Sequence, residues 1–91
     1  MQSFIYVIGP KDGQYVKIGH SRHPEKRLKQ LQTGHSEKLF LWHSEPILLE
    51  LAKAAEKTIH QQIGFKRRIG EWFAVGVEDA IAEVRFGVMS Y

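Results

Sequence analysis

The hydrophobic pattern near the N-terminus is typical of two strands joined by a tight turn. Residues 4–9 and 15–19 are short runs rich in β-branched and aromatic side chains. Between them, Pro10-Lys11-Asp12-Gly13 supplies residues suited to fixed and positive φ angles. We therefore expect an antiparallel hairpin, with Val16 and Ile18 on one face and Tyr15 and Lys17 on the other.

The middle of the chain predicts a helix, a strand and a second helix. Over residues 24–32, Pro24 suits the first helical position, Gly34 ends the helix, and only Leu28 and Leu31 are expected to be buried. Residues 38–43 predict a third strand. Apolar residues then recur with the helical period over residues 46–63, which predicts a long helix.

The C-terminal part is broken at Gly64 and Gly70. Residues 71–75 favour a short extended segment, and residues 77–85 favour a terminal helix with Ala80, Ile81 and Val84 facing inward. The chain has 91 residues, of which 43% are hydrophobic. It therefore predicts a single α+β domain over residues 1–91, with one core.

Composition excludes several classes of protein. The chain contains no Cys, so a disulfide scaffold, a thiolate zinc site and a Cys nucleophile are ruled out. Its apolar runs are far shorter than the ~20 residues of a membrane span, so we expect no membrane partner. No basic segment precedes an apolar one at the N-terminus, and an intracellular, cytoplasmic location is expected.

Charge is distributed unevenly, although the net charge is only +3. Residues 11–29 contain six basic side chains against two acidic ones, whereas residues 69–91 contain Arg85 against four acids. This predicts a basic face for phosphates and an acidic back, with ordinary solvated faces as the alternative. The candidate nucleic-acid-binding residues are Lys11, Arg22, Lys26, Lys29, Lys66, Arg67 and Arg68.

Four positions have the chemistry of a phosphodiesterase that uses one metal ion. Glu56 offers a ligand for Mg²⁺ or Mn²⁺, Arg27 offers charge for a pentacovalent phosphate, and Tyr6 or Lys17 could move a proton. Each also has a structural explanation, such as an i,i+4 pair between Glu56 and His60.

The same residues lie in longer segments of the chain: Phe4-Ile5-Tyr6, Lys17-Ile18-Gly19, the run from Pro24 through Arg27 to Gly34, Ala55-Glu56 with Ile59-His60, and Gly70-Glu71-Trp72-Phe73. Together these segments resemble the GIY-YIG nuclease superfamily, in particular its small phage and bacterial branch. The resemblance covers residues 3 to about 75. It implies a three-stranded antiparallel sheet flanked by three helices, and a metal-dependent endonuclease that hydrolyses DNA.

The resemblance also implies roles for individual residues. Tyr6 corresponds to a general base or water-orienting group, and Arg27 to the catalytic arginine. Glu56 corresponds to the single metal-binding glutamate, and His20 to a basic position near the nucleophile. Lys17 stands where the family usually has tyrosine, and would assist proton removal or hold a phosphate.

This sequence departs from the family pattern at three points. Phe4 replaces the first glycine, Lys17 replaces the second-motif tyrosine, and no asparagine occurs anywhere in the chain.

The proton path is a separate hypothesis. Tyr6 has an ordinary pKa near ~10, so it acts as a base at neutral pH only if nearby cations lower that pKa. The hairpin would place Lys17 on the same sheet face. We therefore expect Lys17 to favour the Tyr6 phenolate, or to take the proton itself.

Other interpretations stay open. His60 is either a partner of Glu56 on the helix surface or a functional group, and a zinc site with a distant histidine lacks characteristic spacing. Trp72 and Phe73 are expected in the core, although an exposed Trp could stack on a base.

Two further functions compete with a DNA endonuclease: a nucleic-acid-binding module that does not cleave, and a protein-interaction domain. No appended DNA-reading domain is visible, so specificity would be weak, or would come from a homodimer or a separate targeting partner.

Overall fold

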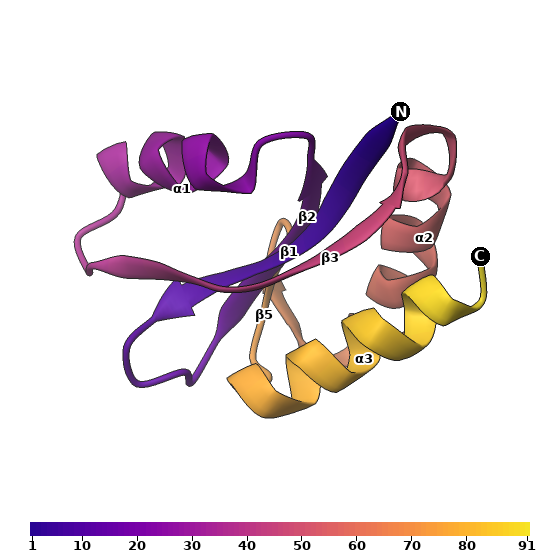
Figure 1. The fold of residues 1–91 in the computed structure, drawn as a ribbon. Helices are drawn as coiled ribbons and strands as arrows, with labels where there is room; N and C mark the ends of the chain where they lie inside the picture. The colour runs from indigo at the N-terminus through magenta and orange to yellow at the C-terminus, as the bar shows by residue number, and fades with distance from the viewer.

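A single antiparallel sheet runs through the structure, a computed structural model that describes residues 1–91, and helices lie on both of its faces (Figure 1). The strand order is β3-β1-β2-β5-β4. Helix α1 covers one face, whereas α2 and α3 cover the other. The elements are β1 (Gln2–Pro10), β2 (Val16–Ser21), α1 (Pro24–Thr33), β3 (Leu39–Leu48), α2 (Leu49–Gln62), the 3₁₀ turn η1 (Gly64–Lys66), β4 (Arg67–Ile69), β5 (Trp72–Phe73) and α3 (Val77–Met89).

The N-terminal hairpin forms as expected. Tyr6 pairs with Gly19 and Ile8 pairs with Lys17, so Tyr6 and Lys17 lie on the same face of the sheet. Val16 and Ile18 point to the opposite face and enter the main core. Gly13 has a φ of 65°, the positive value that the turn requires.

The expected three-stranded sheet is wrong, because the sheet has five strands. The additional hairpin joins β4 to β5 through Gly70, whose φ is 56°, and β5 pairs with β2. All three residues of β4 are exposed, so its sequence shows a run of charge instead of the alternation that marks a half-buried strand. Part of the predicted extended segment, Trp72–Phe73, forms β5.

The boundary between β3 and α2 also differs from the expected one. Residues 46–48 belong to the strand, and the helix begins at Leu49. Strand β3 pairs with the whole length of β1, from Gln2 opposite Leu48 to Pro10 opposite Leu39. Proline has no backbone N–H to donate to a neighbouring strand. Pro46 is tolerated because β3 is an edge strand and has no strand on its other side.

Two hydrophobic clusters lie on the two faces of the sheet. The larger cluster of 13 buried residues joins the sheet to α2 and α3. The smaller one contains Tyr6, Ile8 and Leu39 under α1. Leu28 and Leu31 pack against it but are only half-buried, and the buried residue of α1 is Pro24, which corrects the sequence expectation.

The helices are short. The longest, α2, has 14 residues, and none is both long and apolar enough to cross a membrane. Helix α3 extends to Met89, four residues beyond the predicted end. Its buried Gly87 lies against Ile59 of α2, where a Cβ would come within 3.0 Å of the isoleucine Cδ1.

Candidate active site

Gly19 creates the space in which the Tyr6 side chain lies. A Cβ on Gly19 would come within 2.6 Å of Tyr6 Cζ, a separation that real Cβ atoms do not adopt. The phenol therefore lies directly over the β2 backbone. It is nearly fully buried, at 1% exposure.

Burial raises the pKa of Tyr6 above 10, and this effect outweighs the Arg27 guanidinium, which acts in the opposite direction. The charges of Glu71 and Glu56 raise the pKa further. Tyr6 is thus a protonated phenol at neutral pH, and the idea that neighbouring cations favour its phenolate is wrong. In this form its hydroxyl donates a hydrogen bond and can orient a water molecule or a phosphate.

Lys17 pairs with Glu71, whereas the sequence led us to expect that it acts on Tyr6. Its Nζ lies 3.3 Å from Glu71 Oε1 and 5.7 Å from the centre of the Trp72 ring, and the residue is buried. It is therefore not a freely solvated lysine, and its charge is directed to a carboxylate.

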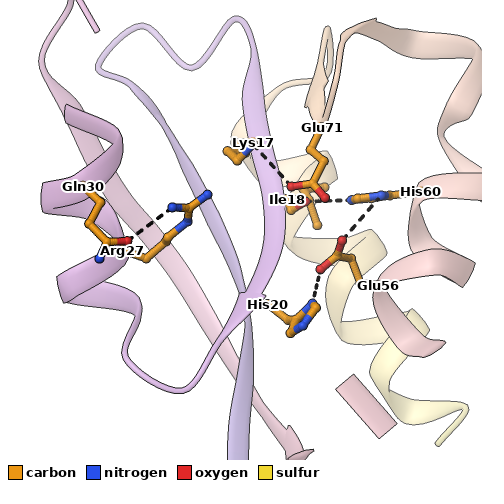
Figure 2. A network of polar contacts seen from close by, with 8 residues as sticks. All are labelled: Lys17, Ile18, His20, Arg27, Gln30, Glu56, His60 and Glu71. Atoms are coloured by element: carbon orange, nitrogen blue, oxygen red, sulfur yellow. Dashed lines mark hydrogen bonds and ion pairs between the residues drawn. The ribbon is translucent and has the colours of Figure 1, made fainter. Parts of the chain in front are cut away.

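Arg27 reaches the same face of the sheet from α1. It is half-buried, and its Nη1 donates to Gln30 Oε1 at 3.2 Å. Figure 2 shows its guanidinium extending from α1 toward β2. A planar guanidinium in this position has donors left for a phosphate.

A compact group of potential metal ligands lies at the other side of β2. Glu56 and His60 are one turn apart on α2, and Glu71 approaches them from the turn between β4 and β5 (Figure 2). One ligand atom from each lies within 4.8 Å of the other two. Glu56 also contacts the Nδ1 of His20.

His60 is held in a defined orientation. Its Nε2 lies 2.7 Å from the carbonyl oxygen of Ile18, which requires that this nitrogen carry a proton and donate. In the neutral ring, Nδ1 is then an acceptor, and it lies 3.9 Å from Glu56 Oε1. The residue is 8% exposed, so it is not the helix-surface partner considered from the sequence. The Nδ1 lone pair of His60 and the carboxylate of Glu56 therefore face each other at a distance that suits a cation bound by both.

The two carboxylates influence each other. Burial raises the pKa of Glu56, a hydrogen bond with His20 opposes this, and Glu71 reinforces it. Burial also acts to raise the pKa of Glu71, but a hydrogen bond from Glu56 and the Lys17 ammonium outweigh it and lower the pKa. Of the two carboxylates, Glu56 thus binds a proton more readily than Glu71, since two adjacent carboxylates resist ionising together.

The donor set fits a divalent cation. Two carboxylates and one imidazole nitrogen suit Mn²⁺, and the carboxylates also suit Mg²⁺. The sequence suggested Glu56 as the sole protein ligand, whereas the structure brings His60 and Glu71 to the same position. No second histidine takes part in this group, although His20 lies beside it.

Glu71 is the functional candidate that received no role from the sequence. It is the only acidic residue between Glu56 and Glu78, and it stands directly before the aromatic pair Trp72-Phe73. A lone carboxylate at the start of an apolar strand was the available signal. Its distance from Glu56 is a property of the tertiary structure alone.

The predicted nucleic-acid-binding residues are all exposed, and they come from several separate elements of the fold. Lys26 and Lys29 lie on α1, and Lys11 and Arg22 lie in loops next to β1 and β2. The remaining three, Lys66, Arg67 and Arg68, lie on η1 and β4.

Arg67 and Arg68 stack on rings that point to opposite faces of the sheet. The Arg67 guanidinium lies over Phe73 of the main core, and that of Arg68 lies over Tyr15 on the α1 side. Of the four acids expected to form an acidic back, Glu78, Asp79 and Glu83 lie on α3, which covers the face opposite α1 (Figure 1). The fourth, Glu71, instead pairs with Lys17.

Comparison with known proteins gives one family. The T5orf172 domain matches residues 3–87, and this domain family is associated with nucleases. No curated protein and no solved structure matches the chain.

The family match overturns the assignment to the GIY-YIG superfamily. The stretches that carried the resemblance are short. The two positions that would name the superfamily hold Phe4 and Lys17 instead of glycine and tyrosine. Packing explains why a tyrosine and a glycine face each other at positions 6 and 19 of the paired strands. The tyrosine ring needs a neighbour without a Cβ.

Proposed function

Because the chain belongs to the T5orf172 domain family, which is associated with nucleases, we propose that it is a metal-dependent endonuclease that hydrolyses DNA phosphodiester bonds. One observation carries the proposal. Glu71 joins two groups of side chains, since it pairs with Lys17 and also lies within ligand distance of Glu56 and His60. Anion-binding and cation-binding groups therefore meet at the edge of β2.

Glu56, His60 and Glu71 would hold Mn²⁺ or Mg²⁺. When bound, such an ion supplies a Lewis acid and lowers the pKa of water. Its charge would also favour the ionised form of both carboxylates.

The groups on the α1 side bind the substrate. Arg27 clamps non-bridging phosphate oxygens and stabilises the charge that develops at phosphorus. Tyr6 donates a hydrogen bond from its protonated phenol and orients the attacking water or the phosphate. Lys17 supplies positive charge next to Glu71.

His20 is the candidate base. It is exposed, with 37% of its side chain accessible, and it contacts Glu56 through Nδ1. Its Nε2 is then free to accept a proton from water. This role passes to His20 because Tyr6 keeps its proton.

Incubation of the purified protein with supercoiled plasmid tests the proposal, with Mn²⁺, Mg²⁺ or a chelator present. We expect nicking only with a divalent cation. Glu56→Gln and Glu71→Gln should lose nicking, whereas Glu50→Gln, an exposed position on the same helix, should retain it.

Binding measured alongside cleavage separates the competing function. Fluorescence anisotropy of labelled DNA, recorded over a range of salt concentrations, reports phosphate contacts without cleavage. Salt-dependent binding by a wild-type protein that nicks under none of these conditions would show a module that binds without cleaving. Equal nicking by Glu56→Gln and wild type would show that the metal site is wrongly assigned.

A further inference from the structure

A pocket of about 340 Å³ opens on the α1 face of the sheet, beside the site described above. Its volume is in the range of sites for small ligands, which begin at ~300 Å³. The residues that line it are Tyr15, His35, Glu37, Arg68, Ile69 and Trp72.

Three rings from distant parts of the chain form one wall of the pocket. The Tyr15 ring stacks on His35 at 6.3 Å between centroids and meets Trp72 edge-on at 5.6 Å. His35 and Trp72 are 5.3 Å apart. All three are half-buried, so part of each ring stays accessible.

Hydrogen bonds hold this wall in place. The Tyr15 hydroxyl donates to Glu37 Oε1 at 2.6 Å, and the Glu37 N–H donates to His35 Nδ1 at 3.2 Å. The rings are thereby oriented before any ligand arrives, which reduces the entropy lost on binding.

Charged groups of both signs stand at the rim. The Arg68 guanidinium lies 4.9 Å from the centre of the Tyr15 ring and has donors for a phosphate. The carboxylate of Glu37 accepts hydrogen bonds, as an exocyclic amine of a base would require. A purely apolar ligand would leave these groups unused.

One lining residue of the pocket, Trp72, is a direct neighbour of two residues of the proposed active site. Trp72 directly follows Glu71 in the chain, and the Lys17 Nζ lies between the Glu71 carboxylate and the Trp72 ring. Trp72 and Lys17 are also paired across β5 and β2. A nucleotide bound against Trp72 would thus lie next to Lys17 and Glu71 of the proposed active site.

We propose that this pocket binds one unpaired nucleobase, stacked on the Tyr15–His35–Trp72 wall with its phosphate on Arg68. The inference rests on the proposed nuclease function and deepens it. Since a base inside a duplex cannot reach such a wall, the substrate is single-stranded, or has a base displaced from its stack.

Tryptophan fluorescence tests the pocket without any cleavage. Trp42 and Trp72 are the two tryptophans of the chain, so Trp42→Phe leaves Trp72 as the sole reporter. With a chelator present, adenosine monophosphate should quench the Trp72 fluorescence in a saturable way. Ribose 5-phosphate, which lacks the base, should not. A single-stranded oligonucleotide should bind more tightly than a duplex of the same length.

Variants of the wall provide the second measurement. Tyr15→Ala should weaken binding about 5- to 150-fold, since base stacking contributes ~1–3 kcal/mol. Tyr15→Phe should retain most of it. The matched control is Phe86→Ala, which removes an exposed ring of α3 far from the pocket. Should Tyr15→Ala fail to fold by circular dichroism, His35→Ala tests the same wall.

The outcomes distinguish this inference from the proposed function. Equal quenching by ribose 5-phosphate and the mononucleotide would overturn the base pocket and leave an anion contact at Arg68. The absence of saturable quenching would overturn it as well. Base binding that persists in a protein with no nicking activity would instead contradict the nuclease function, because the titration contains no metal.

Discussion

The two faces of the sheet differ in what their side chains do. The α2–α3 face buries 13 apolar residues in one continuous cluster. The α1 face buries three and leaves Leu28, Leu31 and Trp72 half-buried. Strands β1 and β2 belong to both faces, so a well-packed side supports a sparsely packed one.

This asymmetry places chemistry where packing is weakest. Lys17, Arg27 and the aromatic pocket all lie on the α1 side, where polar groups keep some access to water. The metal-ligand group lies where α2 meets the edge of β2, at the border between the two faces. Rigid support from one side allows the other to hold charges near each other.

Removing a core ring should have the largest effect on stability. Phe73 is fully buried on the α2–α3 face, and Phe73→Ala should lower the free energy of unfolding by about 3–5 kcal/mol. Leu31→Ala on the α1 face, where the side chain is half-buried, should lower it by less than about 2 kcal/mol. Urea unfolding monitored by circular dichroism measures both. Equal losses would show that the two faces contribute alike.

A change on the α1 face should affect rate more than stability. Arg27→Lys keeps the charge but loses the planar pair of donors, and should raise the activation barrier of cleavage by about 2–4 kcal/mol. Its unfolding midpoint and its affinity for DNA should remain close to those of the wild type. Lys29→Arg on the same helix is the control. Near-normal cleavage by Arg27→Lys would mean that only the charge at this position matters.

Gly19 connects the two effects, because it lies in a shared strand and faces the Tyr6 ring. Gly19→Ala places a methyl group where the phenol lies, and should cost about 1–3 kcal/mol through overpacking. Cleavage should fall as well, since Tyr6 must move. The double variant Gly19→Ala with Tyr6→Leu makes room for the methyl group, and should recover stability without recovering cleavage. If Gly19→Ala were as stable as the wild type, the close approach of the phenol would be disproved.

The smallest expected effect concerns the pH dependence of the pocket wall. The hydrogen bond to Glu37 raises the pKa of Tyr15 to about 12. Because the folded-state pKa exceeds the ordinary value of 10, the neutral phenol stabilises the fold below pH 10. This contribution is lost as the pH rises through about 12.

Ultraviolet absorbance of the phenolate follows this titration. Glu37→Gln should lower the pKa of Tyr15 toward 10, so that part of the titration curve shifts to lower pH. Glu25→Gln on α1 should leave the curve unchanged. An unchanged curve in Glu37→Gln would mean that Glu37 does not hold the Tyr15 hydroxyl.

Much of the fold follows from local sequence. Residues 10–13 set the N-terminal turn, and the alternation of residues 15–19 sets which side chains of β2 face the core. Pro24 and Gly34 bound α1, and the helical period identifies α2 and α3. These features depend on neighbours a few residues apart, so they can be read without a structure. The family, by contrast, followed from the match over residues 3–87, and short motifs led to the wrong one.

Only the tertiary structure determined the site around these elements. Glu71 meets Glu56 because the β4–β5 hairpin turns at Gly70 and β5 pairs with β2. The sequence of β4 is exposed and charged and has no periodicity, so it does not predict this hairpin. His60 can be buried because the carbonyl oxygen of Ile18 in β2 accepts a hydrogen bond from its Nε2–H. Tyr6 keeps its proton because burial outweighs Arg27, a balance of opposing effects that depends on distances across the sheet. The sequence by itself determined which chemical groups are available and on which strands and helices they lie, whereas the pairing of segments far apart in the chain decided which groups meet.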